Sequence, residues 1–379
     1  MESVYITKAA VFFPNEPVSN DEMEQYLGKI NGKPSLARRI VLGKNGIKNR
    51  YYALDKEGHV THTNVQIAAN AIRKLFDEKI SLNDIDLLSC GTTTPDQLLP
   101  SHGVMLRGEL GGERNIEVVS FAGSCCTGMQ AMRYAYLSVL SGSVKNAVCS
   151  ASERLSAWMS ARYFEKETEL FSQIENRPML AFEKEFLRWM LSDGGAALLL
   201  QNKLADNGLS LRVDWVELTS YAHEVETCMY AGSEKQADGS LAGWTMFPES
   251  EWLTKSLFSL KQDTRLLGEN IVPLGGRYML ELAKKWNFKA EDIDWYLPHL
   301  SSMFFKEQIL NEFKKIEFYI PEEKWFLNLP KIGNVASVSP FAMLEELMYS
   351  GKLKKGEKIL LMIPESARFS YSYCMLTVC

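Results

Sequence analysis

The sequence predicts an α/β fold assembled from two similar halves. Short apolar segments alternate with longer segments rich in helix-forming residues, which is the pattern of an α/β protein with buried sheets. Two sequence motifs also recur with the same spacing in the two parts of the chain, which indicates an internal duplication. The length of 379 residues agrees, because it suits two domains or one large duplicated unit.

The expected elements follow from local pattern. The expected strands are short, apolar and often β-branched, and they lie at 116–121, 147–150, 196–200 and 359–363. The expected helices lie at 64–76, 128–140 and 341–349. We expect loops at 55–62 and 165–185, and a lid or core helix at 158–171. The N-terminus carries Glu2 and no basic region, so it reads as a first strand rather than a signal peptide.

The internal repeat is the most informative feature. LNDIDLLSCGTTT (82–94) and AEDIDWYLPHLSS (290–302) both run from an Asp-Ile-Asp turn into an apolar strand. The spacing agrees, since 126 − 85 and 334 − 293 both give 41 positions. We therefore predict halves at 1–207 and 208–379, with Cys126 and Asn334 at equivalent loop-to-helix junctions. Packing about a pseudo-twofold axis would bring such junctions together.

Composition excludes several classes of protein. The formal net charge is -5, which argues against a nucleic-acid-binding protein. The basic stretches at 33–50 and 352–358 suit solvated faces or a dock for an acidic carrier protein. The seven cysteines form no CxxC pair, which favours free thiols in a reducing compartment. No apolar run approaches the ~18 residues of a membrane span, so we expect a cytoplasmic enzyme.

Cys126 is the candidate nucleophile. It follows an expected strand and begins an expected helix, where unpaired N–H groups and the helix dipole favour a thiolate. Gly123 and Gly128 flank it and permit a tight turn. Cys125 is the rival, but the small Thr-Gly pair directly follows Cys126. The alternative is a buried structural cysteine, a common role for this residue type.

His299 and Asn334 are the candidate partners of the cysteine. His299 follows an apolar strand, where a histidine is about as often structural as catalytic, and the duplication places it beside the two junctions. Asn334 begins an expected helix, so it suits an N-cap. Its amide also suits donation to a thioester carbonyl, which with a neutral His299 would stabilise an enolate oxygen. The two interpretations of Asn334 are compatible.

The remaining motifs carry less. His59 and His62 could suggest a metal, but no third residue has ligand spacing, so we expect no metal site. The glycine pair in SDGGAALLL (192–200) belongs to no GxGxxG or P-loop motif, so we reject nucleotide binding.

Five segments together resemble β-ketoacyl-acyl-carrier-protein synthase III and, more broadly, the thiolase superfamily. They are NGIKNRYYA (45–53), TTTPDQLLPS (92–101), SCCTGM (124–129), LPHLSS (297–302) and GNVASVSP (333–340). The resemblance covers nearly the whole chain. It implies the thiolase fold, with αβαβα layers, duplicated halves and two central mixed sheets, and it implies a homodimer.

The resemblance also implies a mechanism. Cys126 would take an acyl group from a thioester, and His299 and Asn334 would stabilise the enolate that attacks it. The oxyanion would be held by the backbone N–H of Cys126 and by a second N–H, assigned to Ala367. The substrates would be carried on the phosphopantetheine of acyl carrier protein or on coenzyme A, and no further cofactor is implied.

Several positions depart from the family pattern near the substrate. The tryptophan that stacks on coenzyme A falls at Ile40 and a neighbouring arginine at Lys44, so we predict a preference for carrier-bound substrates. The phenylalanine that enters the partner's pocket falls at Leu99, while Leu300 and Ser302 replace two amides near His299. These changes favour a longer or branched acyl chain.

Two longer segments also depart from the pattern. The family's GGG loop is replaced by ESARFSYS (365–372), and the segment 154–187 is longer, so it could form a lid or reshape the tunnel. The departures are similar to those of ketosynthases that form dialkylresorcinol or flexirubin-type lipids, which condense two fatty thioesters and cyclise the product to a cyclohexanedione.

Other functions stay open. They are a standard initiating synthase of fatty acid synthesis, a type III polyketide synthase or O-acyltransferase of the same fold, and a non-catalytic partner subunit of a ketosynthase heterodimer. A metal hydrolase would rest on His59 and His62 alone.

Overall fold

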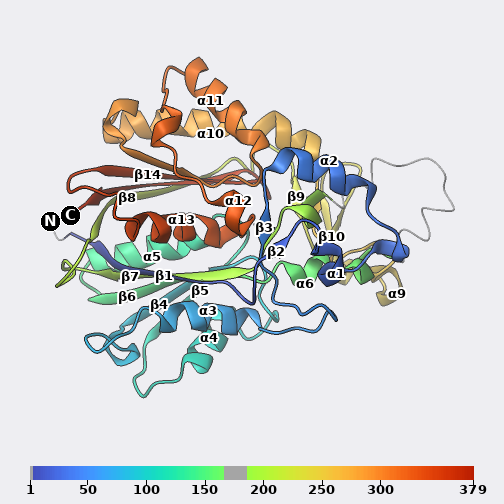
Figure 1. The fold of residues 1–379 in the computed structure, drawn as a ribbon, viewed down its shortest axis with the longest axis horizontal. Helices are drawn as coiled ribbons and strands as arrows, with labels where there is room; N and C mark the ends of the chain where they lie inside the picture. Colours follow the sequence, from blue (N-terminus) through green and yellow to red (C-terminus); the bar gives the residue numbers. More distant parts are fainter. Residues whose placement is uncertain (1–2, 166–185) are drawn as a thin grey trace.

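The computed structural model describes residues 3–165 and 186–379 and arranges them in five layers (Figure 1). Helices α10 (Thr264–Trp286) and α11 (Phe304–Lys315) cover one side, and α3 (Asn64–Arg73) and α4 (His102–Leu110) cover the other. Between the two layers of strands lie α5 (Thr127–Leu140) and α13 (Ser339–Met348). The predicted αβαβα order is confirmed.

Nine strands form the two layers, in the order β13-β14-β15-β8-β1-β7-β6-β4-β5. Their bounds are β1 Tyr5–Phe12, β4 Leu87–Thr92, β5 Glu117–Ala122, β6 Asn146–Glu153, β7 Gly194–Gln201, β8 Leu211–Ser220, β13 Trp295–Pro298, β14 Lys358–Glu365 and β15 Ser370–Val378. The two predicted sheets meet through a short pairing of β1 with β8, at Tyr5–Arg212 and Ile6–Leu211. Hydrogen bonding therefore links both layers in one series of strands.

Smaller elements surround this frame. They are α1 Met23–Leu27, α2 Leu36–Asn45, α6 Ser156–Met159, α9 Glu249–Trp252 and α12 Leu329–Ile332, with the short strands β2 Val18–Ser19, β3 Asn49–Arg50, β9 Met229–Tyr230, β10 Ser233–Lys235, β11 Leu241–Gly243 and β12 Lys261–Gln262. No helix in the described part of the chain has the length and apolar character needed to cross a membrane.

The strands and the three main helices predicted from the sequence agree with the structure apart from their ends. The helix expected at 64–76 stops at Arg73, and the one expected at 341–349 begins two residues early, with Pro340 in its first turn, where proline is tolerated. The expected loop at 55–62 holds only an isolated bridge. The helix expected at 158–171 is wrong in its described part, because α6 ends at Met159 and Ser160 is extended. Most of the loop expected at 165–185, and residues 166–171 of the expected helix, lie outside the described residues.

The internal repeat extends to individual hydrogen bonds. Asp86 donates its N–H to the Asn146 carbonyl at 2.9 Å, and its carboxylate accepts from the Asn146 N–H at 3.1 Å. Asp294 makes the same pair of bonds with Lys358, at 3.0 and 2.8 Å. Each aspartate thus ties the start of one strand to the start of its neighbour. The boundary expected at 207/208 falls between β7 and β8, and the division into two units stays a prediction.

Glycine allows the two halves to approach at the middle layer. A Cβ on Gly128, in the first turn of α5, would lie 2.6 Å from the carbonyl oxygen of Ser337, and one on Gly91 would lie 2.4 Å from that of Thr127. Such distances leave no room for a side chain. The start of α5 is therefore pressed against β4 on one side and against the loop that follows Asn334 on the other.

Candidate active site

A cavity collects residues from both halves of the chain. His299 and Asn334 line it together with Ser124 and Cys125 from the turn before α5. Much of the remaining wall is apolar and includes Leu155, Leu191, Leu260, Leu267, Ile271 and Phe305. The structure therefore brings the histidine, the asparagine and the turn that precedes Cys126 to one apolar space.

The cysteine turn presents two thiols. Cys126 occupies the N-cap position of α5, is fully buried and lies against β14. Its thiol donates to the carbonyl of Ile363 at 3.4 Å, and its N–H donates to the Glu365 carboxylate at 3.2 Å. Cys125 is the thiol that lines the cavity, and it is 8% exposed. Burial, and next the charge of Glu365, raise the pKa of both thiols.

His299 is held by β14 and is electrically neutral near pH 7. The backbone N–H of His299 donates to the carbonyl of Met362 at 2.8 Å, which continues the parallel pairing of β13 with β14. Burial lowers the pKa of its imidazole to about 4. Within the described part of the chain its Nδ1 has no hydrogen-bond partner. A neutral imidazole carries one N–H group, which can donate a hydrogen bond to an enolate oxygen.

Asn334 is fixed by two backbone hydrogen bonds and one side-chain hydrogen bond. Its N–H donates to Met190 at 2.9 Å and its carbonyl accepts from Ser192 at 2.9 Å. Its side-chain oxygen accepts from the Ala336 N–H at 2.9 Å. Because that bond occupies the amide oxygen, the NH₂ group is the end that can donate to a substrate carbonyl. The capping and the donor interpretations are therefore compatible here.

Two buried carboxylates are site residues that the sequence did not single out. Glu365 contacts the Cys126 N–H, and Glu153, at the end of β6, accepts from Thr93, Thr94 and Ser337. Burial raises the pKa of Glu153 to about 7. The available signal was a glutamate that ends an apolar strand in each half, at SASE and at MIPE.

The C-terminal turn contains Ala367, the residue expected to supply the second oxyanion donor. The carbonyl of Ala367 accepts from the N–H groups of Cys228 and Met229, at 2.9 and 3.2 Å, which ties the turn to β9. Glu365, two residues earlier, is the group that reaches the Cys126 N–H. The role of Ala367 as second oxyanion donor stays a prediction.

The two residues expected beside His299 differ in position. Leu300 lines the cavity. Ser302 is buried, and its hydroxyl accepts from the Phe304 N–H at 3.2 Å, so it serves the first turn of α11. Ser301 is the serine of this segment that lines the cavity.

The three remaining expected residues lie on the surface of the single chain. Ile40, on α2, is 53% exposed and Leu99 is 85% exposed. Lys44 is also exposed, and its Nζ lies 6.0 Å from the centre of the Phe304 ring. Their roles at a substrate entrance or in a partner's pocket stay predictions.

The inserted segments contribute to the cavity wall. Leu155 and Leu187, near the ends of the long segment 154–187, both line the cavity. Met229 and Gln262, on the paired strands β9 and β12, line it from the segment between β8 and α10. The shape of the cavity therefore depends on both segments, of which 154–187 is the one expected to be longer than in the family.

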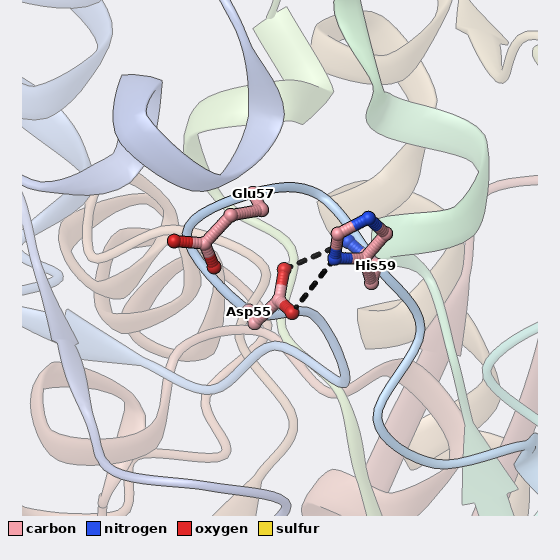
Figure 2. A group of neighbouring side chains, drawn as sticks. All are labelled: Asp55, Glu57 and His59. Atoms are coloured by element: carbon pink, nitrogen blue, oxygen red, sulfur yellow. Dashed lines mark hydrogen bonds and ion pairs between the residues drawn. The ribbon is translucent and has the colours of Figure 1, made fainter.

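The surface loop that carries His59 brings three potential metal ligands together, and hydrogen bonds within the loop already engage one of them. Asp55, Glu57 and His59 place potential ligand atoms close together on one surface loop, as Figure 2 shows. Asp55 is already engaged, because its carboxylate accepts from the backbone N–H of His59 at 2.8 Å and contacts the ring Nδ1 at 3.1 Å. Both contacts fold the loop on itself, and the group includes no part of His62.

Comparison with known proteins finds similar synthases. The family model for 3-oxoacyl-[acyl-carrier-protein (ACP)] synthase III C terminal matches residues 283–363, which contain His299 and Asn334. β-Ketoacyl-acyl-carrier-protein synthase III of Clostridium perfringens (strain SM101) is 23% identical over 369 residues, covering 95% of both chains. The synthase III of Rickettsia felis is 24% identical over 350 residues, covering 92% of both chains.

Solved structures share the fold over nearly the full chain. The tetronic acid condensing enzyme AbyA1 has a TM-score of 0.76 at 18% identity and covers 99% of both chains. OleA of Xanthomonas campestris, in a structure with bound lauric acid and lauroyl-CoA, has a TM-score of 0.73 at 19% identity, again with 99% of both chains covered. By sequence the chain is thus similar to β-ketoacyl-acyl-carrier-protein synthase III, and it shares its fold with condensing enzymes.

Proposed function

We propose that this condensing enzyme loads a fatty acyl group onto Cys126 and joins it to the α-carbon of a second acyl thioester. The observation that carries the proposal is the apolar cavity with His299 and Asn334 at its wall, beside the cysteine turn. An apolar wall favours an acyl chain, while the amide and the neutral imidazole suit the developing enolate oxygen. Cys126 is favoured over Cys125 because the Thr-Gly pair follows it at the start of α5.

We propose further that both substrates are fatty and that the product is cyclised to a dialkylcyclohexanedione, the precursor of a dialkylresorcinol. The apolar lining supports a long acyl chain, and so does the likeness to OleA, whose structure holds lauric acid and lauroyl-CoA. A standard initiating synthase is the alternative. Product mass spectrometry separates the two, because paired β-ketoacyl and enoyl thioesters would yield a ring, whereas a malonyl thioester with a short primer would yield a linear β-ketoacyl chain.

The loading step is tested by intact-mass analysis after incubation with decanoyl-pantetheine. We expect one decanoyl adduct, removable by hydroxylamine, on the wild-type protein and on Cys125→Ser. We expect no such adduct on Cys126→Ser. The two serine variants are matched, since the changes are identical and adjacent.

Two results would reject the proposal. If the adduct were lost in Cys125→Ser and kept in Cys126→Ser, the nucleophile would be Cys125 and not Cys126. An unmodified wild-type protein, together with full activity of a complex that contains Cys126→Ser, would identify a non-catalytic subunit.

A further inference from the structure

A buried carboxylate lies at the amide that is expected to hold the oxyanion. Glu365 is the last residue of β14, and its Oε2 accepts from the Cys126 N–H at 3.2 Å. Two residues earlier on the same strand face, the Ile363 carbonyl accepts from the Cys126 thiol at 3.4 Å. β14 therefore holds both the amide and the sulfur of Cys126.

The charge of Glu365 has little compensation. The side chain is buried, and no ion pair with a lysine, arginine or histidine involves it in the described ranges 3–165 and 186–379. The groups that favour its ionised form are the backbone N–H groups of Cys126 and Ser124 and the hydroxyl of Ser370. Its negative charge thus depends on the positive end of α5.

A thiolate at Cys126 would depend on the same end of α5. Two anions at one helix terminus repel each other, and the charge of Glu365 correspondingly raises the pKa of the Cys126 thiol. The resting nucleophile is therefore a thiol beside a carboxylate, and its attack on a thioester requires a base. His299 is a weak candidate, because burial lowers the pKa of its imidazole to about 4.

We propose that Glu365 is the catalytic base of the acyl-loading step. As the bond forms between Sγ of Cys126 and the acyl carbon, the thiol proton moves to the Glu365 carboxylate. When the bond to the carrier sulfur breaks, the neutral carboxyl group returns this proton to the departing thiolate. No electrons are gained or lost, and the inference rests on the proposed loading of Cys126.

The geometry links this proton transfer to oxyanion binding. The amide nitrogen and the Sγ belong to the same residue, three bonds apart, so the carboxylate that binds the Cys126 N–H also acts on the thiol. A charged acceptor binds an N–H more strongly than a neutral one. Protonation of Glu365 therefore weakens its bond to the Cys126 N–H at the moment when the acyl oxygen becomes negative and needs that donor.

The pH dependence follows from the groups around Glu365. The titratable groups on which the charge of Glu365 acts are the thiols of Cys125 and Cys126, and Glu153 acts on Cys125 as well. With Glu365 present, loading should rise with pH while this carboxyl group ionises and then reach a plateau. Without Glu365, loading depends on the fraction of Cys126 that is already a thiolate. Because burial raises the pKa of this thiol, the loading rate should keep rising through the alkaline range.

The test is single-turnover loading from decanoyl-pantetheine, followed by intact mass from pH 6 to 9, on the wild-type protein, Glu365→Gln, Glu365→Asp and Glu357→Gln. We expect Glu365→Gln to load about 10²-fold to 10⁴-fold more slowly, the usual range for loss of a general base. For Glu365→Gln, the half-saturating substrate concentration should stay unchanged, and the plateau of the loading rate at high pH should be lost. Glu365→Asp should recover most of the rate. Glu357→Gln is the control, because it makes the same change at the residue that directly precedes β14, and it should load at the wild-type rate.

Two outcomes overturn the assignment. Loading of Glu365→Gln within threefold of the wild-type rate would remove the need for a base here. A slower Glu365→Gln with the wild-type plateau intact would mark a positional role only. Failure of the proposed function would look different, since the wild-type protein itself would then carry no acyl group on Cys126.

Discussion

Ser337, three residues after Asn334, donates a hydrogen bond from its hydroxyl to the buried carboxylate of Glu153 at 2.5 Å. The same carboxylate accepts from the N–H and hydroxyl of Thr93 and from the hydroxyl of Thr94. Thr93 lines the cavity, so this network ties the loop of Asn334 in one half to the cavity wall in the other. Glu153 thus acts as a tie between the two halves.

Glu153 should make the stability depend on pH. Burial raises its pKa in the folded protein from 4.5 to about 7. The folded state therefore keeps a proton that the unfolded state releases, and this contribution is complete below the unfolded pKa and is lost as the pH rises through the folded pKa. We expect thermal unfolding midpoints to fall between about pH 5 and pH 8, with a loss on the order of 3 kcal/mol from this group.

The matched variant for this test is Glu153→Gln, which keeps the shape and cannot ionise. The difference in unfolding free energy between the wild-type protein and Glu153→Gln should change with pH in the direction given above. Asp193, whose pKa burial raises to about 6, contributes in the same direction in both proteins and cancels. A difference that is constant over this range would contradict the prediction.

His299 and Asn334 should be needed for condensation and dispensable for loading. We expect His299→Ala and Asn334→Ala to accumulate the acyl adduct on Cys126 while product formation falls about 10²-fold to 10³-fold, the usual cost of one lost oxyanion donor. Intact mass and product mass spectrometry on the same samples measure the two steps. Equal losses in loading and in product would assign both residues to the first step instead.

Gly128→Ala should destabilise the protein. The added Cβ would lie 2.6 Å from the backbone oxygen of Ser337, and backbone cannot move aside as a flexible side chain can. We expect a loss of about 1–3 kcal/mol in urea unfolding. Gly108→Ala, in α4, is the control, since a Cβ there meets nothing within 4 Å and should stabilise by up to about 1 kcal/mol. A neutral Gly128→Ala would mean that the two halves are less closely packed.

The exposed edge of the sheet should pair with a second copy of the chain. β5 ends the series of strands, and Leu98, Leu99 and Val104 near it are exposed by 75%, 85% and 53%. An unprotected edge beside exposed apolar side chains is typical of a symmetric dimer interface. We expect a dimer by sedimentation equilibrium, at least tenfold weaker in Leu99→Asp and unchanged in Leu204→Asp. A monomeric wild-type protein would exclude this arrangement.

The sequence by itself determined the main strands and helices and the positions of the three candidate site residues, while the order of the layers was implied by its resemblance to a known family. Strand and helix type follow from local periodicity, and the shared spacing of 41 positions placed Cys126 and Asn334 at equivalent junctions before any contact was known. The hydrogen bonds of Asp86 and Asp294 show that the repeat is also repeated in backbone pairing.

The tertiary structure alone decided which groups face these residues. Glu365 meets Cys126 across 239 positions, and Ser337 meets Glu153 across 184. Neither pair has a local pattern. The first depends on the register of β14 beside the start of α5, and the second depends on the approach of β6 to the loop before α13. The same packing leaves Cys125 on the cavity wall and Cys126 against β14. Such choices follow from how two sheets and two buried helices fill one space, and a linear pattern does not contain that information.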